Sequence, residues 1–272
     1  MKQFKIRASG AGKIMTGTIG LTDSQQSELD KLNDRKFDSA EGDKGAKPLT
    51  EAMEKKRKEL FEKFSNPVLP KTLTSYCDNW IKEQLYGRRK EFSSKYTEKG
   101  KIMEDDSIDF IADQLGYGFL MKNEDQYEDE YKTGEPDVLP EGDEVIDAKN
   151  SWDCFTFPLF ETEINPDYYA QGQVYLDLTG RKRFKLAYVL SDAPENLVVQ
   201  EAIKFLRAQG YGSLEDNQDV VDEIRNQMSY SHIDPSLRIK VFEFDYDSDF
   251  ISELHNRVDI CRKYIKEKMK GL

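Results

Sequence analysis

The chain is 272 residues long, 38% of its residues are hydrophobic, and its formal net charge is −12. This length and apolar content suffice to bury a full hydrophobic core, and no apolar run is long enough to cross a membrane. The N-terminal residues lack the apolar segment of a secretory signal, and three widely spaced cysteines indicate neither a disulfide framework nor a zinc or iron–sulfur site. We therefore expect a cytoplasmic protein.

The charge is distributed unevenly along the chain. Residues 55–101 carry 13 Lys or Arg against 6 Asp or Glu, whereas residues 104–167 carry 3 against 20. A basic segment followed by an acidic one fits a surface that follows phosphates beside a site that collects cations. A solvated helix face and an acidic loop that keeps the protein in solution explain the same counts equally well.

The first 21 residues contain few helix formers and many Gly, Ser and Thr. Residues 10–13 do not form a nucleotide-binding P-loop, because Arg7 stands where the motif needs its first glycine and Ile14 follows the lysine in place of Ser or Thr. A turn of small residues with Arg7 and Ser9 beside it could still receive a phosphate through its backbone N–H groups.

Helical periodicity follows in three segments, residues 22–32, 48–64 and 73–86. A loop rich in Gly, Asp and Lys is predicted at 38–47, and Gly87 ends the third helix. Arg88, Arg89 and Lys90 then form a basic cluster. The N-terminal region is therefore predicted to be helical.

A further helix is predicted at 97–115, where Ile108, Ile111 and Leu115 recur on one face. Glu104 lies four residues before Ile108, which places it on this inward side near the start of the helix. A carboxylate that points inward needs a partner. A metal ion is one candidate, and a lysine or a capping interaction is the other.

The rest of the chain alternates between strand and helix patterns. Strands are expected at residues 119–122, 126–132, 135–138, 145–149, 184–191 and 237–245. Helices are expected at residues 167–178, 195–209 and 219–230 and in a last segment to Lys270. This order predicts an α+β fold with a mixed central sheet flanked by helices. We expect a single domain over 1–272, with a helical region at 1–95, a catalytic core at 96–191, and C-terminal helices and a strand at 192–272.

Residues 134–149 contain the charged residues that point most directly to a catalytic site. Pro136 favours extended backbone around Asp137, a Pro and a Gly then supply a turn, and a second short strand follows. Asp147 and Lys149 project from one face of that strand, and a hairpin would bring Asp137 beside them. Two carboxylates and an ammonium in a small volume can hold a divalent metal and activate a water. An Asp-x-Lys on an exposed strand is, alternatively, a weak surface ion pair.

Four elements in this order resemble the PD-(D/E)XK nuclease superfamily. They are Glu104 on a helix, Pro136-Asp137, Asp147-Ala148-Lys149, and Gln171 with Tyr175 on the next helix. Within the superfamily the chain is most similar to the lambda-exonuclease-like (YqaJ-type) viral recombinase nucleases. Those also carry an Ala-Ser segment near the N-terminus, matched here by Arg7-Ala8-Ser9, and an Ala-Gln-x-Gln motif on the later helix, matched by Ala170-Gln171-Gly172-Gln173. The resemblance covers residues 96–191 well and the first 20 weakly. Val138 departs from it, because the relatives often carry glycine after the motif aspartate.

The resemblance implies a restriction-endonuclease-like core and metal-dependent hydrolysis of phosphodiester bonds in DNA. The implied ligands of Mg²⁺, for which Mn²⁺ would substitute, are Glu104, Asp137, Asp147 and the Ala148 carbonyl. Hard oxygen ligands agree with this choice of metal. Lys149 would orient or deprotonate the attacking water, and Gln171 or Gln173 would hold that water or a nearby phosphate.

The same resemblance implies an exonuclease of phage-type recombination or replication, acting in the host cytoplasm if the chain is phage-encoded. Its partners would be linear duplex DNA with free ends, a single-strand annealing protein, and further copies of the chain in a ring-like trimer. The residues implied to contact DNA are Arg7, Ser9, Arg88, Arg89 and Tyr175.

Two other functions stay open at this point. An endonuclease can use the same fold, because end specificity depends on loops and not on the motif. A non-catalytic nucleic-acid-binding or assembly protein could also retain the fold, although three carboxylates and the lysine are all present. Hydrolase chemistry based on serine, cysteine or histidine is disfavoured, because the chain has only two histidines, His232 and His255, and both are better explained as surface or core residues.

Overall fold

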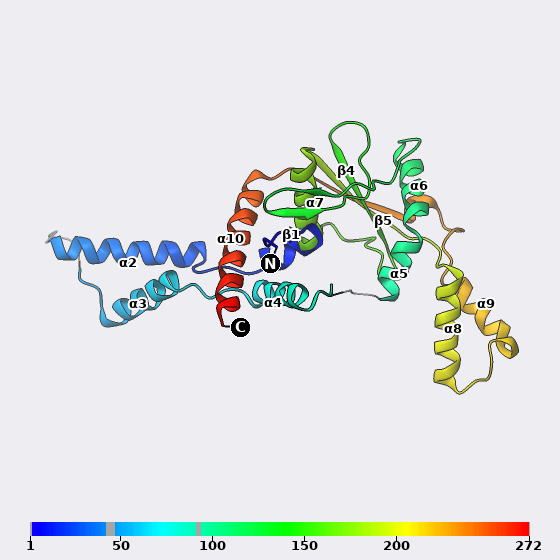
Figure 1. The fold of residues 1–272 in the computed structure, drawn as a ribbon, viewed down its shortest axis with the longest axis horizontal. Coiled ribbons are helices and arrows are strands. Elements are labelled where there is room, and N and C mark those ends of the chain that lie inside the picture. Colours follow the sequence, from blue (N-terminus) through cyan, green and yellow to red (C-terminus); the bar gives the residue numbers. More distant parts are fainter. Residues whose placement is uncertain (1, 42–46, 91–93, 272) are drawn as a thin grey trace. The chain divides into compact units, whose positions relative to one another are not determined.

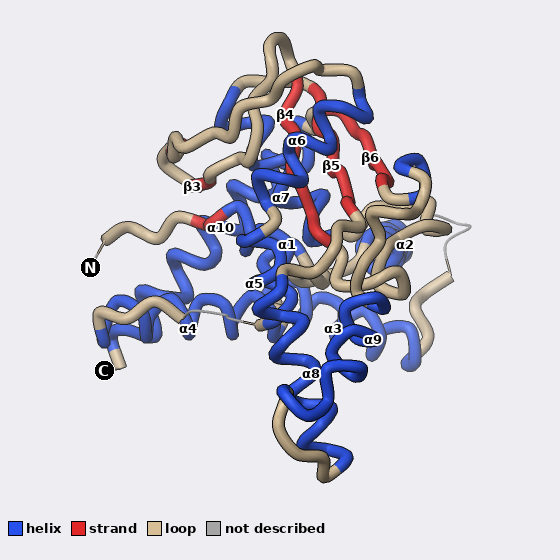
Figure 2. The backbone as a smooth tube through the Cα atoms, turned by 90° about the vertical axis from the view of Figure 1, so that its right-hand side faces the viewer, coloured by secondary structure: helices blue, strands red, loops and turns tan. Residues whose placement is uncertain are grey.

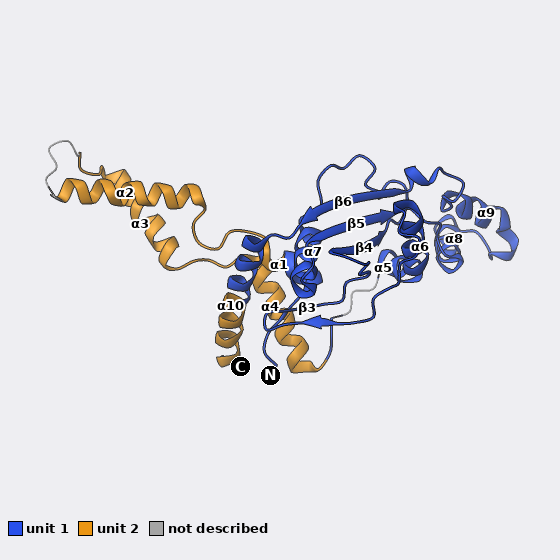
Figure 3. Cartoon of the chain, turned by 90° about the horizontal axis from the view of Figure 1, so that it is seen from above, with its two compact units in different colours: residues 1–12, 88–258 blue, residues 13–87, 259–272 orange. Residues whose placement is uncertain are grey.

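The structure is a computed structural model that describes residues 2–41, 47–90 and 94–271 (Figure 1). The chain divides into two compact units, one formed by Met1–Gly12 with Arg88–Val258 and the other by Lys13–Gly87 with Asp259–Leu272 (Figure 3). The residues expected around the metal all belong to the first unit. The expectation of a single domain stays a prediction.

A three-stranded sheet in the first unit carries the residues of interest. Strand β4 (Glu144–Asn150) pairs in parallel with β5 (Arg183–Val189), and β5 pairs in antiparallel fashion with β6 (Ile239–Asp245). Figure 2 shows the three strands side by side. Because successive side chains alternate, Asp147 and Lys149 share one face of β4.

Helix α6 (Glu104–Leu115) covers the opposite face of the sheet, where Ile146 and Ala148 point. The buried apolar cluster between them consists of Ile108, Ile111, Ala112, Leu120, Val138, Ile146, Ala187 and Val189. This contact fixes the orientation of β4, because turning the strand over would place Asp147 and Lys149 against the apolar cluster.

Helix α7 (Pro166–Thr179) packs on the polar side of β4. Gly172 permits a close approach, because a Cβ at that position would lie 2.5 Å from Phe244 Cζ and 2.8 Å from Phe184 Cδ1. The helix can therefore bring Gln171 to β4.

A second, small sheet connects the start of the chain to the segment before Asp137. Its strands are β1 (Ile6–Arg7), β3 (Lys132–Gly134) and β2 (Tyr127–Glu128), with β1 parallel to β3 and β2 antiparallel to it. The 3₁₀ turn η1 (Ala8–Gly10) follows β1 and packs against α7. At Gly134 a Cβ would lie 2.7 Å from Tyr175 Cε1 and 3.1 Å from Ala8 Cβ, so glycine lets β3, α7 and η1 meet.

The remaining elements are mostly helical. In the first unit they are α5 (Lys95–Ile102), α8 (Glu195–Gln209), η2 (Glu215–Asn217), α9 (Gln218–Gln227) and η3 (Pro235–Leu237). In the second unit they are α2 (Asp23–Glu41), α3 (Glu51–Ser65) and α4 (Lys71–Tyr86), and α1 (Ala11–Met15) and α10 (Ser248–Lys270) belong partly to each unit. Among the described residues, none of the helices has both the length and the apolar character needed to cross a membrane.

The expected α+β class, with its helical N-terminal region, is confirmed, and several boundaries differ. The helix predicted at 97–115 is two helices, because Met103 leaves helical geometry and its carbonyl accepts a hydrogen bond from Asn150 Nδ2. Segments 119–122 and 135–138 contribute isolated bridges through Lys122 and Val138 where strands were predicted. The loop predicted at 38–47 belongs to α2 up to residue 41, and its residues 42–46 lie outside the described ranges.

A buried lysine ties together the ends of β4 and β5. Lys99 on α5 is fully buried, and its Nζ donates hydrogen bonds to the carbonyls of Ser151 at 2.9 Å, Trp152 at 3.1 Å and Ser191 at 2.7 Å. Burial lowers the pKa of the Lys99 ammonium to about 8, and Asp192 opposes this shift in part.

The shifted pKa of Lys99 predicts how stability depends on pH. Between about 8 and the unfolded value of 10.5, the unfolded chain binds more protons at this residue than the folded chain, so the free energy of unfolding should rise with pH. Denaturant titrations from pH 7 to 10 should show this rise in wild type relative to Lys99→Met, with a limiting slope of about 1.4 kcal/mol per pH unit. A difference between the two proteins that does not change with pH would contradict the assignment.

Candidate active site

The predicted hairpin forms and brings Asp137 to β4. Val138 and Ile146 exchange backbone hydrogen bonds of 3.1 Å and 3.0 Å. Asp137 directly precedes Val138, Ala148 follows Ile146 by two residues, and the Ala148 N–H donates to Asp137 Oδ2 at 2.8 Å. Since the N–H and C=O of one strand residue point the same way, the Ala148 carbonyl is directed to the edge of β4 where Asp137 lies.

Asp147 and Lys149 form an ion pair that is not a surface pair. Asp147 is 1% exposed, and the Lys149 ammonium contacts its Oδ2. Within the described ranges, Asp147 Oδ2 is a buried side-chain oxygen without a hydrogen-bond partner, so this charged contact is what it relies on. The Lys149 Nζ also lies 5.3 Å from the centre of the Tyr168 ring. The alternative of a weak exposed pair is therefore wrong.

The closeness of the charges changes their proton affinities. Burial, and next the Asp147 carboxylate, raise the pKa of Asp137 to about 7, against the opposing effects of Lys149 and the Ala148 N–H. Burial lowers the pKa of Lys149, but the carboxylates of Asp147 and Asp137 outweigh it and raise the pKa above its ordinary value. The site therefore holds more negative charge than one ammonium balances.

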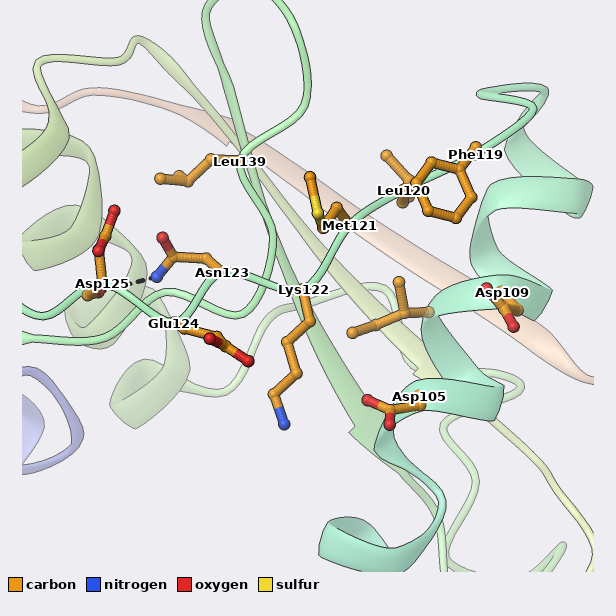
Figure 4. Close-up of a pocket in the computed structure, with 11 residues that line it drawn as sticks. Asp105, Asp109, Phe119, Leu120, Met121, Lys122, Asn123, Glu124, Asp125 and Leu139 are labelled. Atoms are coloured by element: carbon orange, nitrogen blue, oxygen red, sulfur yellow. Dashed lines mark hydrogen bonds between the residues drawn. The ribbon is translucent and has the colours of Figure 1, made fainter.

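Glu104 lies near this pair at the first position of α6 and has its own lysine. Lys122 Nζ is 2.8 Å from Glu104 Oε2, and Figure 4 shows its ammonium extending toward the start of α6 beside Asp105. The Glu104 charge also contributes to the raised pKa of Asp137. Of the two partners that the sequence left open for Glu104, the lysine is the one the structure contains.

An open cavity of about 820 Å³ lies next to this ion pair, and Figure 4 shows residues that line it. Its lining residues are Asp105, Ile108, Asp109, Phe119, Leu120, Met121, Lys122, Asn123, Glu124, Asp125 and Leu139. Four carboxylates line it against one ammonium, so the cavity disfavours an anionic ligand.

The donor set fits a hard divalent cation. Glu104, Asp137, Asp147 and the Ala148 carbonyl supply oxygen ligands, and the buried Asp147 Oδ2 has no hydrogen-bond donor within the described ranges besides its ion-pair contact with Lys149. In the part of the chain that is described, these three carboxylates do not bring their oxygens within 4.8 Å of one another. Lys122 and Lys149 lie on two of them, so binding a metal requires these ammonium groups to move.

A second cluster of possible metal ligands has its ligand atoms closer together, but a lysine ammonium already lies among them. Ligand atoms of Asp129, Asp177 and His255 lie within 4.8 Å of one another. The fully buried Lys132 places its Nζ 2.5 Å from each of the two carboxylates and 3.1 Å from His255 Nε2. The ammonium of Lys132 thus occupies the position that a metal would take.

The two predicted glutamines lie on different faces of α7. Gln171 Nε2 is 3.5 Å from Asp147 Oδ1 and donates to the Tyr175 hydroxyl at 2.9 Å. Gln173 is fully buried and binds the backbone instead, with Nε2 donating to the Asp245 carbonyl and Oε1 accepting from the Asp247 N–H, both at 2.8 Å. A separation of two residues turns a helix by about 200°, so both glutamines cannot face β4. The structure brings Gln171, and not Gln173, to the carboxylates.

The residues expected to contact DNA have different environments. Ser9 is exposed on η1, and Arg7 is partly buried on β1. Arg88 and Arg89 are exposed at the start of their segment of the first unit. Tyr175 is 5% exposed and accepts a hydrogen bond from Gln171, so it supports the site from within.

Sequence reasoning missed three residues around Lys149 and Glu104. Lys122 forms an ion pair with Glu104, and the face of the Tyr168 ring lies over the Lys149 ammonium. Tyr188, on β5, is paired with Lys149 of β4 and packs edge-on against the Tyr168 ring. The available signal was the predicted strand at 184–191, but the register that sets Tyr188 beside Lys149 cannot be read from sequence.

Comparison with solved structures identifies the same fold in known proteins. A phage related exonuclease from Haemophilus somnus 129PT is similar, with a TM-score of 0.67 and 22% identity over 99% of this chain and 97% of that chain. The alkaline exonuclease LHK-Exo from Laribacter hongkongensis is similar with a TM-score of 0.54 and 11% identity, and its complex with dAMP with 0.55 and 12%, each over 98% of this chain and 90% of that one. No protein-family model and no curated protein sequence matches the chain.

Because these sequence identities are low, the structural likeness establishes the fold and not the activity. The chain has the fold of these exonuclease structures along nearly its whole length. The resemblance to lambda-exonuclease-like nucleases drawn from the motifs is confirmed at the level of the fold.

The raised pKa of Asp137 predicts a pH-dependent effect of Asp137→Asn. Wild-type Asp137 binds its proton more tightly when folded, so its ionisation costs stability increasingly from pH 4 to above 7. Asparagine removes that cost and can still accept the Ala148 N–H. With EDTA present, the mutant should gain more in melting temperature over wild type at pH 8 than at pH 5. An equal gain at both pH values would contradict the raised pKa of Asp137.

Proposed function

We propose that the chain is a metal-dependent deoxyribonuclease, and specifically an exonuclease that hydrolyses linear duplex DNA from its ends. The observation that carries this proposal is that the side chains of Asp137, Asp147 and Lys149 lie close together at the end of β4. The similar solved structures are exonucleases, which supports the reaction class. The alternatives are an endonuclease on the same fold and a non-catalytic DNA-binding protein.

The chemistry divides between the metal and the residues around it. Mg²⁺ or Mn²⁺ held by Glu104, Asp137, Asp147 and the Ala148 carbonyl would lower the pKa of a bound water and neutralise charge that develops on the phosphate. The Ala148 N–H fixes the orientation of Asp137, and Gln171 reaches Asp147 from α7. These contacts orient Asp137 and Asp147, while Lys122 and Lys149 would move off Glu104 and Asp147 when the metal binds.

Lys149 is best suited to orienting the water and the phosphate. Its neighbouring carboxylates favour the ammonium form, which donates hydrogen bonds and cannot accept a proton. It can therefore pair with a phosphate oxygen beside the attacking water. Tyr168 supports the ammonium from its ring face.

The remaining parts of the proposal concern partners. Linear duplex DNA would reach the carboxylates past the N-terminal segment, where Arg7 and Ser9 are candidates for a terminal phosphate, and Arg88 and Arg89 would contact the backbone. Phage-type recombination in the host cytoplasm, a single-strand annealing partner and a ring-like trimer belong to the same proposal.

Activity assays test the proposal through Lys149. Wild type should degrade linear duplex DNA in Mg²⁺, leave closed-circular DNA intact, and do nothing in EDTA. Lys149→Ala and Asp147→Ala should lose at least about 100-fold in rate, whereas Lys182→Ala, at an exposed lysine, should not. Lys149→Ala protein with the wild-type rate would refute the assignment, and equal cleavage of closed circles would favour the endonuclease.

A second assay tests the end-recognition role of Arg7. Arg7→Ala should slow digestion of 5′-phosphorylated duplex more than digestion of 5′-hydroxyl duplex, because only the first substrate offers the terminal phosphate charge. Lys5→Ala is the matched control, since Lys5 is a neighbouring cation that pairs with Glu128 at 3.2 Å. Equal slowing on both substrates would reduce Arg7 to a structural or general electrostatic role.

A further inference from the structure

The segment 151–165, which connects β4 to α7, exposes two phenylalanines. Phe155 is 93% exposed and Phe160 is 87% exposed, the highest values among the large hydrophobic residues in the described ranges. The segment begins two residues after Lys149 and leads into the helix of Gln171. Isolated exposed apolar residues are common on proteins, so their exposure alone has no functional meaning.

The local structure keeps Phe155 in this exposed position. Asp153 Oδ1 accepts hydrogen bonds from the backbone N–H groups of Phe155 at 3.1 Å and Thr156 at 2.8 Å, which fixes a tight turn. Phe157 is 6% exposed and packs with Leu190 and Tyr230. An anchor two residues away and a fixed turn hold Phe155 outward, so the ring cannot simply fold into the core.

Phe160 lies on the part of the segment that returns to the site. Its N–H donates to Glu161 Oε2 at 3.1 Å. Phe157, three residues before Phe160, belongs to the buried cluster against which Tyr188 packs, and Tyr188 is the neighbour of Lys149 in the sheet. Three residues span at most about 10 Å along the chain, and the six residues from Lys149 to Phe155 span at most about 20 Å. Both rings are therefore tied to the end of β4 that carries Lys149.

The charge of the segment decides which part of DNA it suits. Its ionisable side chains are acidic, namely Asp153, Glu161 and Glu163, together with Cys154. Carboxylates repel phosphates, so contact with the backbone is disfavoured. A nucleobase has a neutral π-face and stacks on an aromatic ring without needing a positive charge. In a duplex those faces are covered, except at an end where the pairs open.

We propose that Phe155 and Phe160 stack on unpaired nucleobases at the end of the DNA that enters the site. This inference rests on the proposed nuclease function and adds to it the part of the substrate that the segment recognises. The rings would hold an opened end while its phosphate lies at Lys149.

The test compares Phe155→Ala/Phe160→Ala with Phe155→Trp/Phe160→Trp, and uses Phe205→Ala, at a half-exposed phenylalanine on α8, as the matched control. The substrates are two linear duplexes, one ordinary and one with abasic terminal nucleotides. On the ordinary duplex the alanine variant should raise KM at least about 10-fold while kcat changes little, and the tryptophan variant and the control should behave as wild type. On the abasic duplex all four proteins should have the same KM.

A second measurement needs no cleavage. In EDTA, 2-aminopurine at the duplex end should change fluorescence on binding wild type and not on binding the alanine variant. Under the same conditions, DNA should protect the exposed Cys154 from alkylation, whereas Cys77 and Cys261 are buried.

The outcomes separate the two proposals. Cleavage that is unaffected by the alanine substitutions, with no fluorescence change, would overturn the stacking proposal and leave the nuclease proposal standing. A wild-type protein that cleaves no substrate but gives the fluorescence change would overturn the nuclease proposal and leave the stacking proposal standing. An equal KM increase on ordinary and abasic duplexes would show a role in folding or phosphate contact and overturn stacking. So would a loss of self-association in sedimentation as the sole effect, which would identify a second copy of the chain as the occupant.

Discussion

The like charge of Asp137 and Asp147 is the constraint on which the arrangement of the site depends. The Val138–Ile146 bridge sets the two carboxylates on neighbouring segments, and burial raises the cost of ionising both. Lys149 offsets one charge, and Lys122 offsets that of Glu104. An excess of buried negative charge is costly for folding and useful for binding a cation, since the cation relieves the repulsion that the fold has imposed.

The rest of the first unit holds this unfavourable group in place. Apolar packing of α6 on Ile146 fixes which face of β4 is polar, and Gly172 lets α7 close over that face. Lys99 joins the ends of β4 and β5 through three backbone carbonyls. The stability that these contacts provide allows the site to keep charges that would otherwise separate.

Local chemistry made much of the fold and the central pair predictable. Pro136 and the period-two pattern predicted the hairpin and the Asp147–Lys149 face, and helical periodicity predicted the helix that carries Gln171. Contacts between distant segments were not predictable, because no local pattern encodes them: Lys122 reaches Glu104, and strand register sets Tyr188 beside Lys149. Gln173 illustrates the same limit, since the motif does not show that its side chain binds the Asp245 and Asp247 backbone.

Metal binding to the folded protein tests the central claim most directly. A cation that binds the native site alone stabilises by RT ln(1 + [L]/Kd), about 2.7 kcal/mol at a hundredfold excess over Kd, or roughly 5–10 °C in melting temperature. Millimolar Mn²⁺ should produce this rise in wild type, NaCl at matched ionic strength should not, and Asp147→Asn should lose most of it. An equal rise with NaCl, or an Asp147→Asn protein that responds fully to Mn²⁺, would contradict a shared-ion site.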